Sequence, residues 1–382
     1  MKANWNYPTT VWAGEGRLSE VANACQSLNI RKPLIVTDPG LVDSSMVEKV
    51  VSVSEENGLA CSVFSAVDSN PTAANIEDGV HAYRDRMNDG VVAIGGGSAL
   101  DAGKTVALMA WQNQSLWDFE DVGCNWRRAN AAVIAPIVAV PTTAGTGSEV
   151  GRSAVILDEV QPLKRIIFHP QILPSVVILD PLVTLSLPAH LTAATGMDAL
   201  SHNLEAFCSP QYHPLAEGIA LEGMRLVDKF LLRAVSDGGD IEARMQMLVA
   251  STMGATAFQR GLGAMHALAH PLGALFNAHH GTLNAILMPY VLRANRPAIE
   301  TNMDRLSRYL GLEPRGFEGV LQWVLNLRIQ MDIPSHLAEI GIDGSCFDRI
   351  GKMAVDDPSA VTNPLPFSPS QYQHLFVEAL GT

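Results

Sequence analysis

One stretch of the sequence changes abruptly from an apolar run to glycines and then to helix-forming residues: Val91-Val92-Ala93-Ile94-Gly95-Gly96-Gly97-Ser98-Ala99-Leu100-Asp101-Ala102-Gly103-Lys104. The apolar run is typical of a buried strand, and the glycines precede a predicted helix. Glycines expose backbone N–H groups at the start of that helix, and such a terminus binds phosphate. The alternative is a tight turn in which Ser98 caps the helix and Asp101 completes a capping box.

Other parts of the chain extend this pattern of strands and helices. Apolar runs closed by turn signals occur at residues 34–37, 133–140 and 176–179, which indicates a mostly parallel sheet covered on both faces. From Pro188 onward most segments, such as 215–235 and 241–258, have helical periodicity, and no convincing strand is found. We therefore expect an α/β domain over residues 1–185 and an all-helical domain over residues 186–382.

The composition excludes several classes of function. Of the 382 residues, 47% are hydrophobic and 17% charged, which indicates a folded globular protein. Lys+Arg total 26 and Asp+Glu 39, and the net charge of 26 − 39 = −13 repels nucleic acid and anionic lipid. The five cysteines are scattered, and the start lacks the pattern of a signal peptide, so we expect a cytoplasmic protein without nucleic-acid or membrane partners.

A second loop rich in glycine and hydroxyl groups follows a predicted strand: Pro141-Thr142-Thr143-Ala144-Gly145-Thr146-Gly147-Ser148-Glu149. Two such loops at the carboxyl ends of strands in one sheet favour a bound nucleotide. Asp38 follows an earlier strand, where its carboxylate can accept hydrogen bonds from a ribose diol and would repel a 2′-phosphate, which favours NAD over NADP. Alternatively, Asp38 is only a residue of an Asp-Pro-Gly turn.

Acidic and imidazole side chains gather in the second half of the chain. Asp198 and His202 lie four residues apart on one helix face, and four of the chain's eleven histidines fall within residues 266–280. Taken separately, Asp198 and His202 could be an ordinary i,i+4 pair, and the histidines of residues 266–280 could be unrelated to it. Together, one carboxylate and two or three imidazoles suit Fe²⁺ or Zn²⁺, and the sequence alone does not separate His279 from His280 as a ligand.

In these segments the chain resembles the iron-containing (group III) alcohol dehydrogenases, from near the N-terminus to about Asn363-Pro364. The resembling pieces are residues 95–104, 141–149, 196–205 and 266–281. The resemblance implies that the metal ligands are Asp198, His202, His266 and, directly before a glycine, His280. It also implies that His270 lies near the substrate and nicotinamide as the catalytic histidine. The alternative for His270 is a helix-end residue just before Pro271.

The same resemblance implies a set of residues that line the dinucleotide cleft: Asp38, Asn70, Gly96, Gly97, Ser98, Asp101, Thr142, Thr143, Thr146 and Lys164. Without the resemblance, Lys164 would be an ordinary surface lysine. The chain departs from the family at Gly151, where a threonine is usual, so one hydroxyl group near the cofactor is missing. Arg152 and Ser153 either compensate for it or face the substrate.

The expected function is a metal-dependent, NAD(H)-linked alcohol dehydrogenase or aldehyde reductase, with a dinucleotide-binding first domain and a metal-binding catalytic second domain. Hydride passes between a small alcohol and NAD while Fe²⁺ or Zn²⁺ holds the alkoxide, and His270 carries the alcohol proton outwards. If Arg152 pairs with a carboxylate, the substrate is instead a hydroxyacid. A lyase resembling dehydroquinate synthase and a non-enzymatic NAD-binding sensor are the competing hypotheses. The family expectation is a homodimer or larger homo-oligomer.

Overall fold

The structure is a computed structural model that describes residues 7, 9–161 and 163–381. The chain divides into two compact units. The α/β unit contains the described residues of 7–143 and 147–186, and the helical unit contains residues 144–146 and the described residues from 187 onward.

The α/β unit is built on a six-stranded sheet in which all pairings are parallel, with the order β1-β8-β5-β4-β2-β3. Its strands are β1 (Thr10–Ala13), β2 (Pro33–Val36), β3 (Ser62–Phe64), β4 (Gly90–Gly95), β5 (Ile137–Pro141) and β8 (Val176–Leu179). Every residue of β2, β4, β5 and β8 is buried, as continuous apolar runs require.

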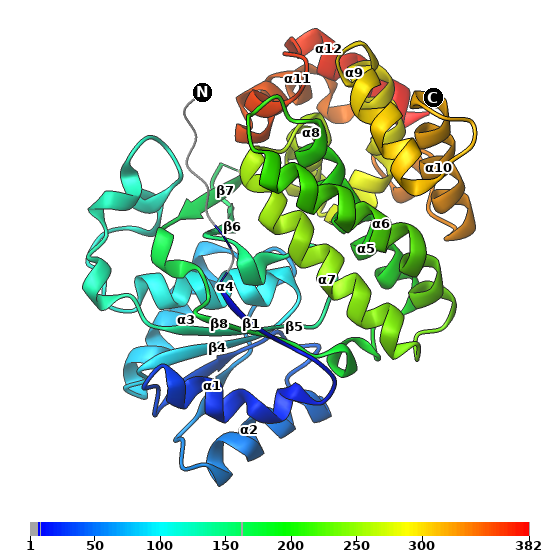
Figure 1. The fold of residues 1–382 in the computed structure, drawn as a ribbon. Coiled ribbons are helices and arrows are strands. Elements are labelled where there is room, and N and C mark those ends of the chain that lie inside the picture. The colour runs from blue at the N-terminus through cyan, green and yellow to red at the C-terminus, as the bar shows by residue number, and fades with distance from the viewer. Residues whose placement is uncertain (1–6, 8, 162, 382) are drawn as a thin grey trace. The chain divides into compact units, whose positions relative to one another are not determined.

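Helices cover both faces of this sheet. In Figure 1, α1 (Val21–Ser27) and α2 (Ser45–Glu56) lie on one face, and α3 (Ala73–Asp85) and α4 (Gly97–Met109) lie on the other. The expected α/β architecture with a mostly parallel sheet is confirmed.

Most differences from the expected strands occur at strand ends and sheet edges. The strand expected over 133–140 begins only at Ile137, because residues 131–133 form a 3₁₀ turn in which Asn130 accepts a hydrogen bond from the Ala132 amide (3.2 Å). The short edge strands β1 and β3 were not expected. Neither was the antiparallel hairpin of β6 (Ser153–Asp158) and β7 (Leu163–Phe168).

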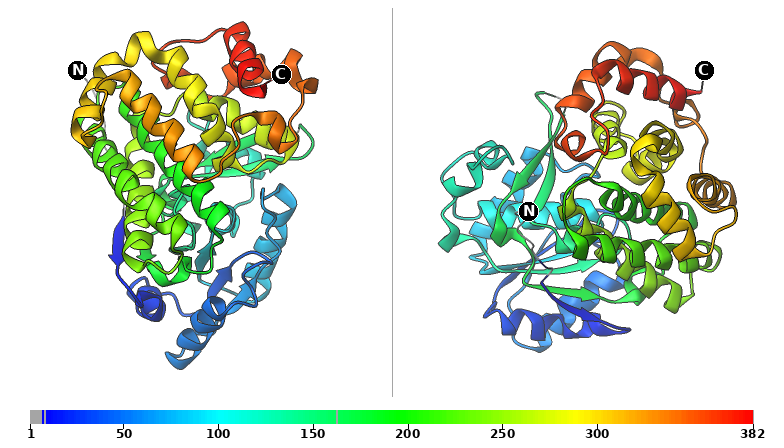
Figure 2. Two further views of the ribbon diagram at one scale, coloured as in Figure 1. Left: turned by 90° about the vertical axis from the view of Figure 1, so that its right-hand side faces the viewer. Right: turned by 45° about the horizontal axis from the view of Figure 1, so that its top comes forward.

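The helical unit has no strand among its described residues. Its helices are α5 (Ala189–Cys208), α6 (Pro214–Ser236), α7 (Ile241–Ala257), α8 (Ala264–Phe276), α9 (His280–Leu310), α10 (Phe317–Gln330), α11 (Phe347–Asp356) and α12 (Pro369–Leu380). Figure 2 shows them packed side by side in two views. The helices expected over 215–235 and 241–258 are confirmed as α6 and α7.

Helix α5 is the most enclosed helix of this unit. It is buried without interruption from Thr192 to Phe207, so its polar residues Asp198, His202 and Glu205 lie in the protein interior. Buried polar groups are costly unless they find partners, so these three side chains indicate a functional site on α5. Within the described residues, no helix combines the length and apolar character that a bilayer span requires.

Candidate active site

Helix α5 contributes two side chains to a buried cluster of metal-ligating groups. Asp198 and His202 lie one turn apart and are only 2% and 5% exposed. Helix α7 packs closely here, since a Cβ added at Gly254 would lie 3.0 Å from His202 Cβ.

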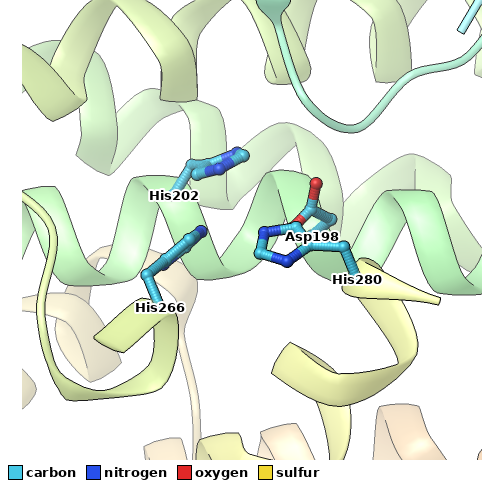
Figure 3. Close-up of side chains that lie close together, drawn as sticks. All are labelled: Asp198, His202, His266 and His280. Atoms are coloured by element: carbon cyan, nitrogen blue, oxygen red, sulfur yellow. The ribbon is translucent and has the colours of Figure 1, made fainter. Parts of the chain in front are cut away.

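Two further histidines join the cluster from other helices. His266 lies on α8, and His280 is the first residue of α9. One ligating atom from each of Asp198, His202, His266 and His280 lies within 4.8 Å of the others, and Figure 3 shows the four side chains converging. His279 instead caps α9, with its Nδ1 accepting a hydrogen bond from the Thr282 amide (3.4 Å). The structure therefore groups His280, and not His279, with the other three.

The ring orientations suit a metal ion. His266 Nδ1 donates to Glu205 Oε2 (2.7 Å), and His202 Nδ1 donates to the Gly145 carbonyl (3.2 Å). Each ring therefore has its lone pair on Nε2. Burial lowers the pKa of His266 well below its ordinary value, so its imidazole is neutral, as a ligand must be. Three imidazoles and a carboxylate in one largely buried cluster fit a divalent ion such as Fe²⁺ or Zn²⁺.

Glu205 holds His266 in place. Its fully buried carboxylate also accepts hydrogen bonds from the Gly263 and Met265 amides, both at 2.7 Å. Burial raises the pKa of Glu205 to about 7, although these amides oppose the shift. Glu205 had no predicted role, although its position two turns after Asp198 on the same helix was a usable signal.

Asn284 also reaches the cluster and was not foreseen. Its Nδ2 lies 2.9 Å from Asp198 Oδ1, 3.2 Å from His266 Nε2 and 3.1 Å from His280 Nε2. Asn284 lies four residues after His280, so the i,i+4 rule could have found it.

His270 lies beside the cluster and is held by an acidic residue. Helix α8 continues through Pro271 to Phe276, so the alternative of a helix-end histidine is wrong. The His270 ring stacks on that of His280, with centroids 5.4 Å apart, and its Nδ1 donates to Asp357 Oδ2 (2.8 Å). Burial opposes ionisation of Asp357, but His270 and Ser359 outweigh it and lower the pKa of this carboxyl. Asp357 lies 87 residues further along the chain, and no local pattern marks it.

In the α/β unit, the glycine loop lies beside Asp38. Gly95 has φ of +149°, and a Cβ there would lie 2.6 Å from Ala99 Cβ and 3.3 Å from Asp38 Oδ2. The other Asp38 oxygen accepts a hydrogen bond from the Gly40 amide (2.9 Å), so Asp38 is also a turn residue, as the Asp-Pro-Gly pattern predicts.

The alternative interpretation of this loop, a turn with a capping box, is wrong. Helix α4 begins at Gly97 with Gly96 as its N-cap and has no side-chain cap, so the glycine amides are not covered by a serine oxygen. Ser98 donates instead to the Ser69 carbonyl (2.5 Å). This bond places the segment that carries Asn70 next to the start of α4.

Asp101 connects the two glycine-rich loops. Its carboxylate accepts hydrogen bonds from Ser148 Oγ (2.5 Å) and the Val155 amide (2.9 Å), and it pairs with the buried Lys104 ammonium (3.0 Å). Lys104 also donates to the carbonyls of Ser148 and Ser153. The Asp101 carboxylate therefore shapes the loop that follows β5.

The remaining residues of the expected cleft lie around these loops. The Thr142 amide donates to the Gly95 carbonyl (3.0 Å), and a Cβ at Gly96 would lie 3.5 Å from Thr143 Cγ2. Lys164 pairs in register with Leu157, whose amide donates to the carbonyl of Pro71, the residue after Asn70 (2.8 Å). Thr146 belongs to the helical unit.

The space around residue 151 does not require a glycine, although the chain has Gly151 where a threonine is usual in the family. Its φ of −96° suits any residue, and an added Cβ would make only ordinary contacts, 3.5 Å from the Ser148 carbonyl oxygen being the nearest. The neighbouring Arg152 guanidinium lies over the Phe168 ring, 5.6 Å from its centroid.

Comparisons with known proteins give the class to which this fold and site belong. Residues 8–181 match the family model "Iron-containing alcohol dehydrogenase", and residues 192–380 match that of the C-terminal part of Fe-containing alcohol dehydrogenases. The chain therefore belongs to the iron-containing alcohol dehydrogenase family. The expected family and enzyme class, an oxidoreductase, are confirmed.

Individual relatives are similar over the whole chain. A 4-hydroxybutyrate dehydrogenase of Cupriavidus necator is 38% identical and covers 98% of this chain and 99% of its own. The crystal structure of a 1,3-propanediol oxidoreductase has a TM-score of 0.93 at 34% identity and covers 99% of this chain and 100% of its own. A sulfoacetaldehyde reductase of Bifidobacterium kashiwanohense, solved in complex with NAD⁺, has a TM-score of 0.90 at 27% identity, with complete coverage of both chains. The expected NAD and metal cofactors agree with these relatives.

Proposed function

We propose that this protein interconverts small alcohols and their aldehydes with NAD(H), using a divalent metal held by Asp198, His202, His266 and His280. The observation that carries the proposal is the convergence of these four donors, three of them buried, within 4.8 Å in the helical unit. When bound, the metal supplies Lewis acidity that makes an alcohol oxygen more acidic.

His270 is the proposed proton carrier of this reaction. Asp357 accepts the Nδ1 proton of His270, which leaves the Nε2 lone pair available to take a proton. The ionised Asp357 carboxylate also stabilises the imidazolium formed by that transfer. His270 stacks on His280, so the proton acceptor lies directly beside the proposed metal ligands.

The proposed dinucleotide site uses the two glycine-rich loops that follow β4 and β5. The bare amides of Gly96 and Gly97 at the start of α4 suit a pyrophosphate. Asp38, beside Gly95, suits the ribose diol of NAD, and its charge disfavours NADP. Asn70, Ser98, Asp101, Thr142, Thr143, Thr146 and Lys164 complete the proposed set. When bound, NAD supplies the hydride acceptor.

The test is NADH oxidation by the apo-protein reconstituted separately with Fe²⁺ and Zn²⁺, against short aldehydes and oxoacids. Metal-dependent turnover is expected. Asp198→Ala and His266→Ala should abolish turnover and leave NADH binding, followed by fluorescence, unchanged. The control is His190→Ala, which changes an exposed histidine on α5, the helix that carries Asp198. This variant should keep full activity. Full activity in either ligand variant would refute the metal assignment, whereas product without NADH consumption would favour the lyase.

A hydroxyacid substrate is the second candidate. It is favoured by the similarity to a 4-hydroxybutyrate dehydrogenase and by the cationic Arg152 in the loop after β5. If Arg152 pairs with a substrate carboxylate, Arg152→Leu should raise KM for oxoacids only. An unchanged KM would remove this candidate.

The proposed location of the protein is the cytoplasm, and its proposed assembly is a homo-oligomer. All five cysteines are free thiols, which suits a reducing cytoplasm. A homodimer or larger homo-oligomer is the family expectation, and light scattering at several protein concentrations would measure it.

A further inference from the structure

The glycine-rich loop that follows β5 is divided between the two units. Its ends, residues 141–143 and 147–149, belong to the α/β unit, whereas residues 144–146 belong to the helical unit. The loop carries Thr142, Thr143 and Thr146 of the proposed dinucleotide site. A change in either unit can therefore reach these residues through the chain itself.

Hydrogen bonds within the α/β unit hold both ends of this loop. The Thr142 amide donates to the carbonyl of Gly95, the last residue of β4 (3.0 Å). At the other end, Ser148 Oγ donates to the Asp101 carboxylate (2.5 Å), and the Ser148 carbonyl accepts a hydrogen bond from the Lys104 ammonium (3.0 Å). Asp101 and Lys104 lie on α4, the helix whose first amides are proposed to bind the pyrophosphate.

The middle of the loop contacts a proposed metal ligand. The Gly145 carbonyl accepts a buried hydrogen bond from His202 Nδ1 (3.2 Å). Gly145 also lies close against α5, since an added Cβ would lie 2.8 Å from Thr195 Cβ and 2.9 Å from the Thr195 carbonyl oxygen. The neighbouring Ala144 packs against the core of the helical unit. One imidazole thus presents Nε2 to the proposed metal site and holds the dinucleotide loop through Nδ1.

The two nitrogens of an imidazole influence each other. A cation on Nε2 withdraws electron density from the ring, which makes the Nδ1–H group a stronger hydrogen-bond donor. Ligation also fixes the orientation of the ring, so less conformational entropy remains to be lost when the loop is ordered. Both effects hold residues 144–146 more firmly, and they reduce the cost of ordering the loop around a dinucleotide.

We propose that the Gly145 carbonyl is a positioning group that couples the two sites, so that a metal ion on His202 strengthens binding of the dinucleotide. The inference rests on the proposed function, because it needs both ligands. Coupling is reciprocal, so each ligand changes the affinity for the other by the same factor. A hydrogen bond that gains part of the strength of a charge-assisted bond corresponds to a factor of about five.

The test is calorimetric titration of ADP-ribose into the apo-protein and into the protein loaded with Zn²⁺. ADP-ribose has the phosphates and riboses of NAD but lacks the nicotinamide ring, the part that reacts beside the metal. We expect Zn²⁺ to lower the Kd of ADP-ribose by about fivefold. ADP-ribose should lower the Kd of Zn²⁺, measured by chelator competition, by the same factor.

Gly145→Ala is the variant that tests the carbonyl. The Gly145 backbone does not lie in the left-handed region, so the obstacle to alanine is Thr195, and the methyl group should push the loop away from α5. Weakening of the bond to His202 should bring the ratio of the two ADP-ribose Kd values close to one. A uniform loss of ADP-ribose affinity leaves this ratio unchanged.

Gly151→Ala is the matched control. It adds the same methyl group just after the loop, where an added Cβ makes only ordinary contacts, the nearest at 3.5 Å. This variant should keep the full ratio of the wild-type protein.

If Gly145→Ala does not fold or does not bind ADP-ribose, the His202 ring of the wild-type protein carries the test. In protein labelled with ¹⁵N-histidine and loaded with Zn²⁺, the Nδ1 signal of His202 is identified by its loss in His202→Gln. Addition of ADP-ribose should shift this signal, and an unshifted signal would overturn the inference.

Failure of the coupling and failure of the proposed function give different results. Equal ADP-ribose Kd values with and without Zn²⁺ in the wild-type protein, or the full ratio in folded Gly145→Ala, would overturn the coupling and leave both sites in place. If the wild-type protein bound no Zn²⁺ or no ADP-ribose, the proposed function itself would fail, and the inference with it.

Discussion

At the scale of single residues, the imidazole of His266 depends on Glu205. The carboxylate accepts the Nδ1 proton of His266 at 2.7 Å, and this bond keeps the Nε2 lone pair directed into the cluster. Two amide donors hold the carboxylate itself, so the pair is a rigid unit within α5 and α8. Partners of this kind orient metal-binding histidines and increase their basicity.

Replacement of Glu205 by Gln tests this dependence. The amide group of glutamine keeps the shape but has only one acceptor oxygen for the three donors. We expect affinity for Zn²⁺ or Fe²⁺ to fall by about 10–100-fold, measured by chelator competition. Glu242→Gln, which changes an exposed carboxylate on α7, is the control. An unaltered metal affinity in Glu205→Gln would show that Glu205 only fills space.

At the scale of elements, the cluster requires a close approach of α9 to α5. A methyl group added at Gly281 would overlap the Ala194 carbonyl oxygen and lie 3.2 Å from Asp198 Cβ. Ala194 lies in the tightly packed helix α5, whose backbone cannot easily move. The start of α9 would therefore have to shift away from α5 to make room for the methyl group. Because His280 is the preceding residue, any shift moves a proposed ligand.

Gly281→Ala should therefore lower stability by about 1–3 kcal/mol and also weaken metal binding. Gly196→Ala is the matched variant within α5. Its methyl group would meet the terminal carbons of Leu231, which can rotate, and alanine adds up to about 1 kcal/mol of helix propensity. Thermal unfolding and Zn²⁺ affinity should change little in Gly196→Ala. Equal effects of the two substitutions would contradict this explanation of the glycine at 281.

At the scale of the whole molecule, the residues proposed to bind the metal ion and those proposed to bind the phosphate and ribose of the dinucleotide belong to different units. All four proposed metal ligands lie in the helical unit, whereas Asp38 and the glycines at the start of α4 lie in the α/β unit. A ligand that binds only the folded state raises the free energy of unfolding, by about 2.7 kcal/mol at a hundredfold excess over Kd.

Hydrogen exchange followed by mass spectrometry should separate these effects. Zn²⁺ alone at a hundredfold excess over Kd is expected to slow exchange in α5, α8 and the start of α9 by about a hundredfold, where exchange requires unfolding of that unit. NADH alone should protect residues 95–101 and 38–40. Zn²⁺ protection that was strongest in residues 95–101 would refute the location of the metal site.

Local patterns in the sequence were sufficient for the features that depend on neighbours along the chain. Continuous apolar runs predicted β2, β4 and β8, because strands buried on both faces exclude polar residues. The i,i+4 spacing of Asp198 and His202 placed them on one helix face, since that spacing is set by the helix itself. Family resemblance chose His280, which local pattern could not distinguish from His279.

Which distant groups meet depends on the tertiary structure alone. His266 and His280 lie more than sixty residues after His202 in the sequence, and Asp357 reaches His270 across 87 residues. The alternative of a capping box by Ser98 and Asp101 is wrong for the same reason, because these side chains bond to Ser69, Ser148 and Val155 instead. Hydrogen-bond partners of buried polar groups are chosen by packing, since an unsatisfied buried group is costly wherever the fold places it.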